Sequence, residues 1–154
     1  MKKKTSYLAF TLLLFLFACT NAPELPTEDE AKAAIMEKIE KANDAWSNGN
    51  PMGFLDNAAQ DITWMDDLMA TTPVNGYEAL EVYLANFKGV IPAHEKKLFN
   101  FLFQFYDDIV IVTYHYQGEL DGNMLPPWKV TSVFRYADGN WLSVHENWTE
   151  VDEE

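Results

Sequence analysis

The sequence has little cysteine, few basic residues and few histidines, and each shortage excludes a class of protein. One cysteine in 154 residues excludes an internal disulfide framework and a cysteine-rich zinc site. The 11 lysines and arginines stand against 24 aspartates and glutamates, which gives a formal net charge of −13. This balance argues against a nucleic-acid partner, because contacts to phosphate backbones need clustered cations. His94, His115 and His145 show no zinc-type spacing, so we expect neither a metal nor a cofactor.

Familiar catalytic motifs are also missing: we find no glycine-rich phosphate loop, no nucleophile elbow and no internal repeat. Hydrophobic residues make up 48% of the chain and aromatic residues 14%, which is too aromatic for a disordered chain. The length fits one domain with an appendage, and not two domains.

The N-terminus predicts a secretory signal peptide over residues 1–18. Lys2, Lys3 and Lys4 precede a nearly all-apolar stretch over residues 7–18. As a helix this stretch would span about 18 Å, which is too short for a bilayer core of about 30 Å. The segment ends in LFAC at residues 16–19, which resembles a bacterial lipobox and implies cleavage before Cys19 and acylation of its thiol. The alternative is an ordinary signal peptide cut near Ala18, which leaves a free thiol.

Cleavage changes the charge of the protein, because residues 1–18 hold three lysines and no acid. The mature chain would carry 8 basic and 24 acidic residues, or −16, and anionic lipid would repel it. Membrane attachment would then depend on acyl chains at Cys19. We therefore expect a lipid-anchored, extracytoplasmic protein of the bacterial cell envelope, with a tether over residues 19–27 and a folded domain over residues 28–151.

Three helices are predicted in the first half of that domain. Thr27 and Glu30 form a capping box ahead of an apolar stripe that fits a helix of about 20 residues, and Gly49 ends it. Asn50 and Pro51 begin a second, short helix. The third helix is capped by Asn75 with Glu78 and runs to about Lys88. The apolar stripes are Ile35, Ile39, Ala42 and Trp46 in the first helix, Phe54, Leu55, Ala58 and Ala59 in the second, and Tyr77, Leu80, Leu84 and Phe87 in the third.

The second half predicts strands. Residues 61–65 read as a short strand, and from Lys96 the hydrophobic period changes to two. The expected strands cover residues 96–106, 109–117, 128–136 and 141–151, with turns at residues 107–108, 121–123 and 138–139. The fold class is therefore α+β, with helices packed on one face of a mostly antiparallel sheet.

Several strands are apolar on both faces, as with Val110 and Val112 against Ile109 and Ile111. Antiparallel sheets usually expose one face to solvent, so a sheet that is apolar on both faces needs a packing partner on each face. The helices cover one face, and a second copy of the chain is the simplest cover for the other. We therefore expect the protein to form a homodimer.

The stretch WLSVHENWT at residues 141–149, after Asp138 and Gly139, resembles the last strand of SnoaL-like domains of the nuclear transport factor 2-like superfamily. It is also similar to the association domain of calcium/calmodulin-dependent kinase II. The likeness extends to residues 46–50, 61–64, 75–77 and 129–135 and covers roughly residues 30–151. The family pattern commonly has histidine where Asn147 stands.

The resemblance implies a cone-shaped curved sheet wrapped around the N-terminal helix, with two further helices and a pocket between sheet and helices. It also implies dimerisation through the outer face of the sheet. It does not imply one activity, because members include isomerases, cyclases, hydratases, ligand binders and oligomerisation modules.

The candidate catalytic residues are His145, His115 and Asp66, with Tyr114 or Tyr116 as possible donors. A pocket isomerase needs a base near an apolar substrate and a neutral donor for the developing oxyanion. The alternative is that both histidines are hydrogen-bonded strand residues in the core or a dimer contact, and that Asp66 and Asp67 are a solvated strand end. Candidate ligand contacts are Trp46, Trp64, Tyr83, Phe134 and Asn147.

Strand parity places His145 and Asn147 on one face of the last strand and Glu146 and Trp148 on the other. If His115 and His145 both point into the cone, they form one polar cluster under the helices. The sequence leaves open which face is inward.

Three functions follow. The leading hypothesis is a membrane-anchored domain that binds a small, largely apolar molecule. The first alternative is an isomerase, hydratase or cyclase with His115 or His145 as general base. The second alternative is a dimerisation module whose pocket is filled by phenylalanine and tryptophan side chains.

Overall fold

The structure is a computed structural model that describes residues 25–68 and 72–151. The predicted signal peptide over residues 1–18, the predicted acylation site Cys19 and the first part of the predicted tether lie outside the described residues. Within the described part of the chain, no helix has both the length and the apolar character needed to cross a bilayer.

The described residues form three helices and a seven-stranded sheet. The helices are α1 (Glu28–Ser47), the 3₁₀-helix η1 (Pro51–Asn57) and α2 (Tyr77–Ala85). The strands are β1 (Ala58–Asp66), β2 (Val74–Asn75), β3 (Glu95–Tyr106), β4 (Ile109–Leu120), β5 (Asn123–Met124), β6 (Trp128–Ala137) and β7 (Asn140–Glu150).

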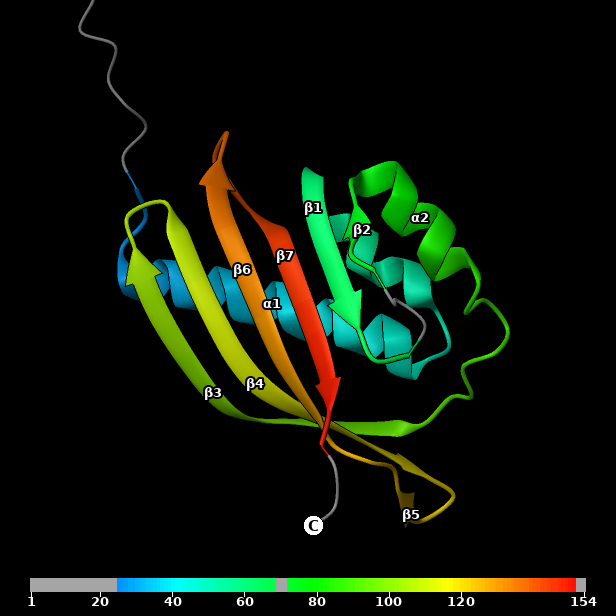
Figure 1. Ribbon diagram of the computed structural model, residues 1–154. Helices are drawn as coiled ribbons and strands as arrows, with labels where there is room; N and C mark the ends of the chain where they lie inside the picture. The colour runs from blue at the N-terminus through cyan, green and yellow to red at the C-terminus, as the bar shows by residue number, and fades with distance from the viewer. Residues whose placement is uncertain (1–24, 69–71, 152–154) are drawn as a thin grey trace, which may run out of the picture.

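The sheet has the order β2-β1-β7-β6-β4-β3, with β5 paired to β4. All pairs are antiparallel except β1 with β7, which is parallel. The sheet is strongly curved and does not close, and α1 runs across its concave side while α2 lies beside β1 and β2 (Figure 1). This confirms the predicted cone-shaped, mostly antiparallel sheet around the N-terminal helix, with two further helices.

The first helix is the one that the sequence predicts. Thr27 Oγ1 accepts the backbone N–H of Glu30, and the Glu30 carboxylate accepts the backbone N–H of Thr27 at 2.9 Å, so the capping box is complete. Ile35, Ile39 and Ala42 are buried against the sheet. Gly49 follows the helix with φ of +81°, a conformation that favours glycine.

Three helix predictions need correction. Asn75 does not cap α2. It lies in β2, where it pairs with Thr63 of β1, and its side chain donates to the Pro73 carbonyl. Gly76 precedes the helix without a side-chain cap. The helix ends at Ala85 rather than near Lys88, and the residues after it form a turn. Ala58 and Ala59 are buried as expected, but they belong to β1 and not to the second helix.

The phenylalanine series on β3 divides at a bulge. Asn100 has φ of +58°, and the register with β4 shifts between Phe99 and Leu102. Phe99 therefore pairs with His115 on the face of the sheet away from α1. After the bulge, Phe101, Phe103 and Phe105 pack on the core. The sequence had predicted a single uninterrupted alternation.

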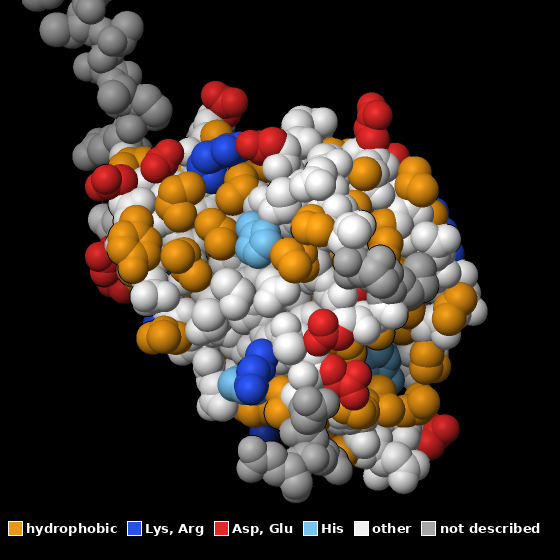
Figure 2. All heavy atoms as spheres, viewed as in Figure 1, with side chains coloured by type: hydrophobic (Ala, Val, Ile, Leu, Met, Phe, Trp, Pro, Cys, Tyr) orange, Lys and Arg blue, Asp and Glu red, His pale blue; other side chains and the backbone are white. Residues whose placement is uncertain are grey.

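Alternation on β4 identifies the two faces of the sheet. Val110, Val112, Tyr114 and Tyr116 are buried toward α1, and Asn43 of α1 donates to the Tyr114 hydroxyl at 3.3 Å. The intervening residues, including Ile111 and His115, face away from α1 and are partly exposed. Figure 2 shows hydrophobic side chains gathered on this outer face. Met65, Leu102 and Tyr106 are its exposed large hydrophobics.

Candidate functional site

The cone is hollow at one end. A cavity of about 330 Å³ lies between η1, β1, α2, the segment after α2 and the ends of β4, β6 and β7. Its lining residues are mostly apolar: Trp46, Phe54, Trp64, Leu68, Leu84, Phe87, Val90, Ile91, Pro92, Leu125, Pro126, Trp128 and Trp148 with Gly118, and the polar members Asp66, Tyr83, His94 and Tyr116.

Aromatic rings in mutual contact build the inner wall. The rings of Phe54 and Trp64 lie edge to face with centroids 5.1 Å apart, and Trp64 stacks on Trp148 at 6.1 Å. Trp46 of α1 contacts Phe87 at 5.6 Å. The Trp148 Nε1–H is buried and has no hydrogen-bond partner among the described residues. The wall is therefore apolar, and it contains one neutral donor, the Trp148 Nε1–H, that has no partner among the described residues.

Asp66 is the buried acid of the cavity, with an exposed fraction of 7%. It ends β1 two residues after Trp64, so both side chains point to the same face. The Trp64 Nε1–H donates to Oδ2 at 2.6 Å, and the Leu68 backbone N–H donates to Oδ1 at 2.9 Å. The Tyr83 hydroxyl of α2 donates to the same carboxylate at 2.5 Å and 2.7 Å. These donors stabilise a carboxylate in an apolar wall.

Burial therefore contradicts the prediction that Asp66 is part of a solvated strand end. Only Asp67 is exposed, where its carboxylate accepts the Glu150 backbone N–H at 3.1 Å.

His94 and Tyr116 form a second polar pair in the cavity wall. His94 Nδ1 lies 2.8 Å from the Pro92 carbonyl oxygen, and His94 Nε2 is hydrogen-bonded to the Tyr116 hydroxyl. Burial raises the pKa of the Tyr116 hydroxyl, so it stays protonated. Gly118 makes room for this pair, because a Cβ there would lie 2.9 Å from the imidazole Cδ2 of His94.

The predicted site residues divide between the cavity and other places. Trp46, Trp64, Asp66 and Tyr83 line the cavity. Phe134 lies deeper, on the wall of a second, smaller cavity. The other three predicted residues, His115, His145 and Asn147, lie on the outer face of the sheet.

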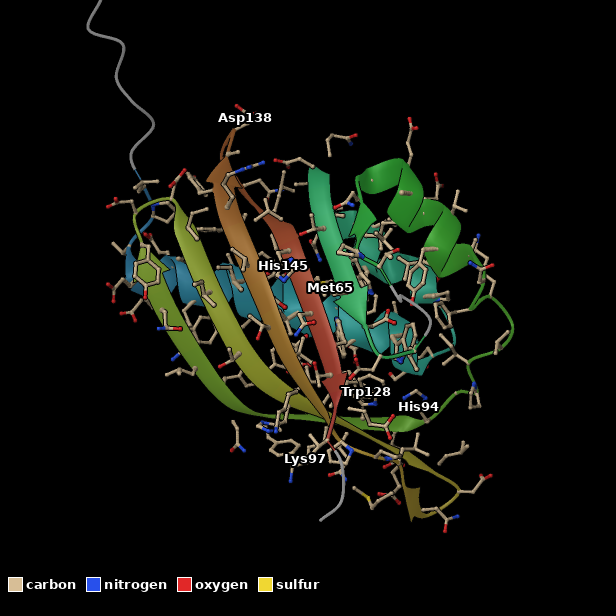
Figure 3. The ribbon with its side chains drawn as sticks, in the orientation of Figure 1. Met65, His94, Lys97, Trp128, Asp138 and His145 are labelled. Carbon is tan, nitrogen blue, oxygen red and sulfur yellow. The ribbon has the colours of Figure 1, made fainter. Side chains whose placement is uncertain are left out.

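The two histidines therefore form no cluster under the helices. His145 Nδ1 lies 2.7 Å from the Thr63 hydroxyl, and the His115 ring stacks on Phe99 at 5.2 Å. In Figure 3, His145 and Met65 lie over the middle of the sheet, whereas His94 and Trp128 lie beside the lower ends of the strands.

The second cavity, of about 20 Å³, contains a buried acid that the sequence analysis did not single out. Glu146 accepts hydroxyl hydrogens from Ser132 at 2.5 Å and Ser143 at 2.7 Å, and burial raises its pKa to about 7. Strand parity had already placed Glu146 opposite His145, so fixing the inward face would have identified it.

His94 was also not among the predicted site residues. Its contact with Tyr116 joins residues 22 positions apart and therefore leaves no local sequence pattern. Residues 25–68 and 72–151 contain no cluster of three or more histidine, cysteine or acidic side chains able to hold a metal ion.

No protein-family model and no curated protein matches the sequence. Solved structures do match. A "putative ketosteroid isomerase" from Parabacteroides distasonis has a TM-score of 0.64 and 22% identity, over 74% of this chain and 85% of that one. An "NTF2-like protein" from Pseudomonas putida has a TM-score of 0.68 and 18% identity, over 83% and 92%.

A third similar structure is a "putative calcium/calmodulin dependent protein kinase II association domain" from Xanthomonas campestris. Its TM-score is 0.62 at 19% identity, over 84% of this chain and 91% of that one. Together these likenesses establish the NTF2-like fold that the sequence resemblance implied. At such identities they establish no activity, because this fold carries many.

Proposed function

We propose that the protein binds a small, largely apolar molecule in the 330 Å³ cavity, with a polar group of the ligand placed near Asp66 and Tyr83. The observation that carries the proposal is the hollow itself. Protein interiors pack with few voids larger than a water molecule, whereas ligand sites are apolar clefts of about 300–1,000 Å³ with a few placed polar groups. A hollow of this size does not fit the alternative of a module whose pocket is filled by aromatic side chains.

Thermal-shift screening of the protein against small aromatic and carbonyl compounds tests the proposal. Ile91→Trp, which puts a larger side chain on the cavity wall, should abolish the stabilisation that a binding compound gives, and Thr113→Trp on the outer face of β4 should leave it intact. Absence of stabilisation by every compound class would contradict the proposal.

A second candidate function is an isomerase, hydratase or cyclase reaction in the same cavity. The observation that favours it is a buried carboxylate, Asp66, in an aromatic wall that also holds the unpartnered Trp148 Nε1–H. Asp66 would remove a proton from the carbon beside a substrate carbonyl and return it elsewhere, while a neutral donor stabilises the oxyanion. Asp66 takes the base role here because His115 and His145 face away from the cavity.

Asp66→Asn separates binding from turnover. The amide keeps the shape of the side chain but removes the base, so a positioned base predicts a loss in turnover of about 10²–10⁴-fold with ligand affinity changed much less. Unchanged turnover in this variant would remove Asp66 as the base. Tyr83→Phe should lower turnover by a smaller factor, because it removes one donor to the carboxylate and leaves the carboxylate in place.

We also propose that two copies pair through the outer face of the sheet. The apolar side chains of Met65, Leu102 and Tyr106 support this, since a monomer would leave them in water. A similar structure is named as an association domain, which fits an assembly role for that face.

Anchoring through Cys19 remains our proposal from the sequence, together with an extracytoplasmic place in the bacterial cell envelope. Its support is the basic start, the short apolar run and the LFAC sequence at residues 16–19. Cys19→Ala should move the protein from the membrane fraction to the soluble fraction and abolish labelling by a radioactive fatty acid. An unlabelled wild-type protein would contradict acylation.

A further inference from the structure

His94 is held in one orientation from three sides. Its backbone N–H donates to the Ser47 carbonyl at the end of α1 at 2.9 Å. Its Nδ1 meets the Pro92 carbonyl, and its ring edge lies over Gly118, where a Cβ would clash with it. The imidazole therefore points its Nε2 at the Tyr116 hydroxyl.

The Pro92 carbonyl fixes the proton on His94. A carbonyl oxygen only accepts hydrogen bonds, so Nδ1 carries the hydrogen and donates it. In a neutral imidazole the other nitrogen, Nε2, then has a lone pair and accepts. The Tyr116 hydroxyl must donate its hydrogen to that lone pair. What Tyr116 offers to a ligand is therefore the lone pairs of its oxygen.

We infer that the His94–Tyr116 pair makes this end of the cavity a hydrogen-bond acceptor, so that the ligand is an apolar molecule with an O–H or N–H donor. This inference rests on the proposed binding function of the same cavity. It favours phenols and alcohols over the ethers and ketones of the same shape. The cavity would bind a phenol more tightly than the matching ether, because the ether has no O–H to donate to the buried Tyr116 oxygen.

The test uses 2-naphthol and 2-methoxynaphthalene, two probes with the same rings that differ in one O–H. Titration calorimetry of the protein should give tighter binding of 2-naphthol than of 2-methoxynaphthalene, by about tenfold. Tyr116→Phe should remove this preference.

Asp66→Asn distinguishes the two polar ends of the cavity, and thermal unfolding checks that each variant is folded. If the preference is lost in Asp66→Asn and kept in Tyr116→Phe, the inference is overturned and the donor contacts Asp66. Equal binding of both probes by the wild-type protein overturns the inference and leaves the proposed function standing. Binding of neither probe contradicts both.

Discussion

At the scale of single residues, the two buried acids of this domain have different roles. Asp66 opens on the large cavity and accepts hydrogen bonds from the Trp64 indole, the Leu68 backbone and the Tyr83 hydroxyl. Glu146 lies under α1 with two serine hydroxyls, and burial raises its pKa to about 7. The first acid is suited to contact a ligand, and the second affects how stability depends on pH.

Glu146→Gln should change that pH dependence. The unfolded chain loses the Glu146 proton near pH 4.5, whereas the folded chain keeps it until about pH 7. The folded state therefore binds more protons in this interval, so this stability is fully present below pH 4.5 and is lost as pH rises through 7. The loss is on the order of 3 kcal/mol.

Urea unfolding between pH 4 and pH 8 measures this effect. The wild-type free energy of unfolding should fall across the interval relative to that of Glu146→Gln, which has no proton to lose. Parallel curves for the two proteins would show that Glu146 is ionised in the folded state. Glu150→Gln, an exposed acid on the same strand, is the matched control and should keep the wild-type slope.

At the scale of elements, α1 shows how local sequence determines structure. Its start is closed by reciprocal hydrogen bonds between Thr27 and Glu30, and its inward stripe recurs at helical spacing. Thr27→Ala should lower the free energy of unfolding by about 1 kcal/mol, because it leaves a backbone N–H of the first turn without its acceptor. Thr27→Ser keeps the acceptor and should cost little. Equal losses in both variants, measured by chemical denaturation, would argue against the cap.

The sequence was sufficient for elements whose signal is periodic and local. The first helix, the hairpin at Asp138 and Gly139 and the four long strands all follow from spacing and turn residues. The sequence was insufficient where a tertiary contact determines the bounds of an element or the face on which a side chain lies. The pairing of Asn75 with Thr63 shifts the start of α2, and the bulge at Asn100 moves Phe99 to the outer face.

The candidate site was predictable only in part, for a related reason. Parity correctly separated His145 from Glu146, but one sequence did not say which face was inward. The buried series that begins with Val110 and Val112 settles this in the structure and places His115 outside. The contact of His94 with Tyr116 depends on how the segment after α2 meets β4, which no spacing rule encodes.

At the scale of the whole molecule, the protein combines strong negative charge with an apolar outer face. Copies of a chain of net charge −13 should repel one another unless a surface favours their association. Leu102, with 59% of its surface exposed, lies on β3 of the outer face. If two copies pair through this face as proposed, Leu102→Glu should turn the proposed dimer into a monomer in sedimentation equilibrium at micromolar concentration.

Val82→Glu on α2 adds the same charge at another exposed site and should leave the proposed dimer intact. A wild-type protein that sediments as a monomer would contradict pairing through the sheet.

Backbone NMR of the protein during titration with 2-naphthol shows whether the hollow end of the cone receives a small apolar molecule. Binding in the cavity should give saturable chemical-shift changes that cluster at cavity residues such as Asp66, Leu84, His94 and Gly118, while Leu102 and His145 on the outer face stay unchanged. Changes confined to the outer face, or none that saturate, would show that the molecule does not bind in the cavity.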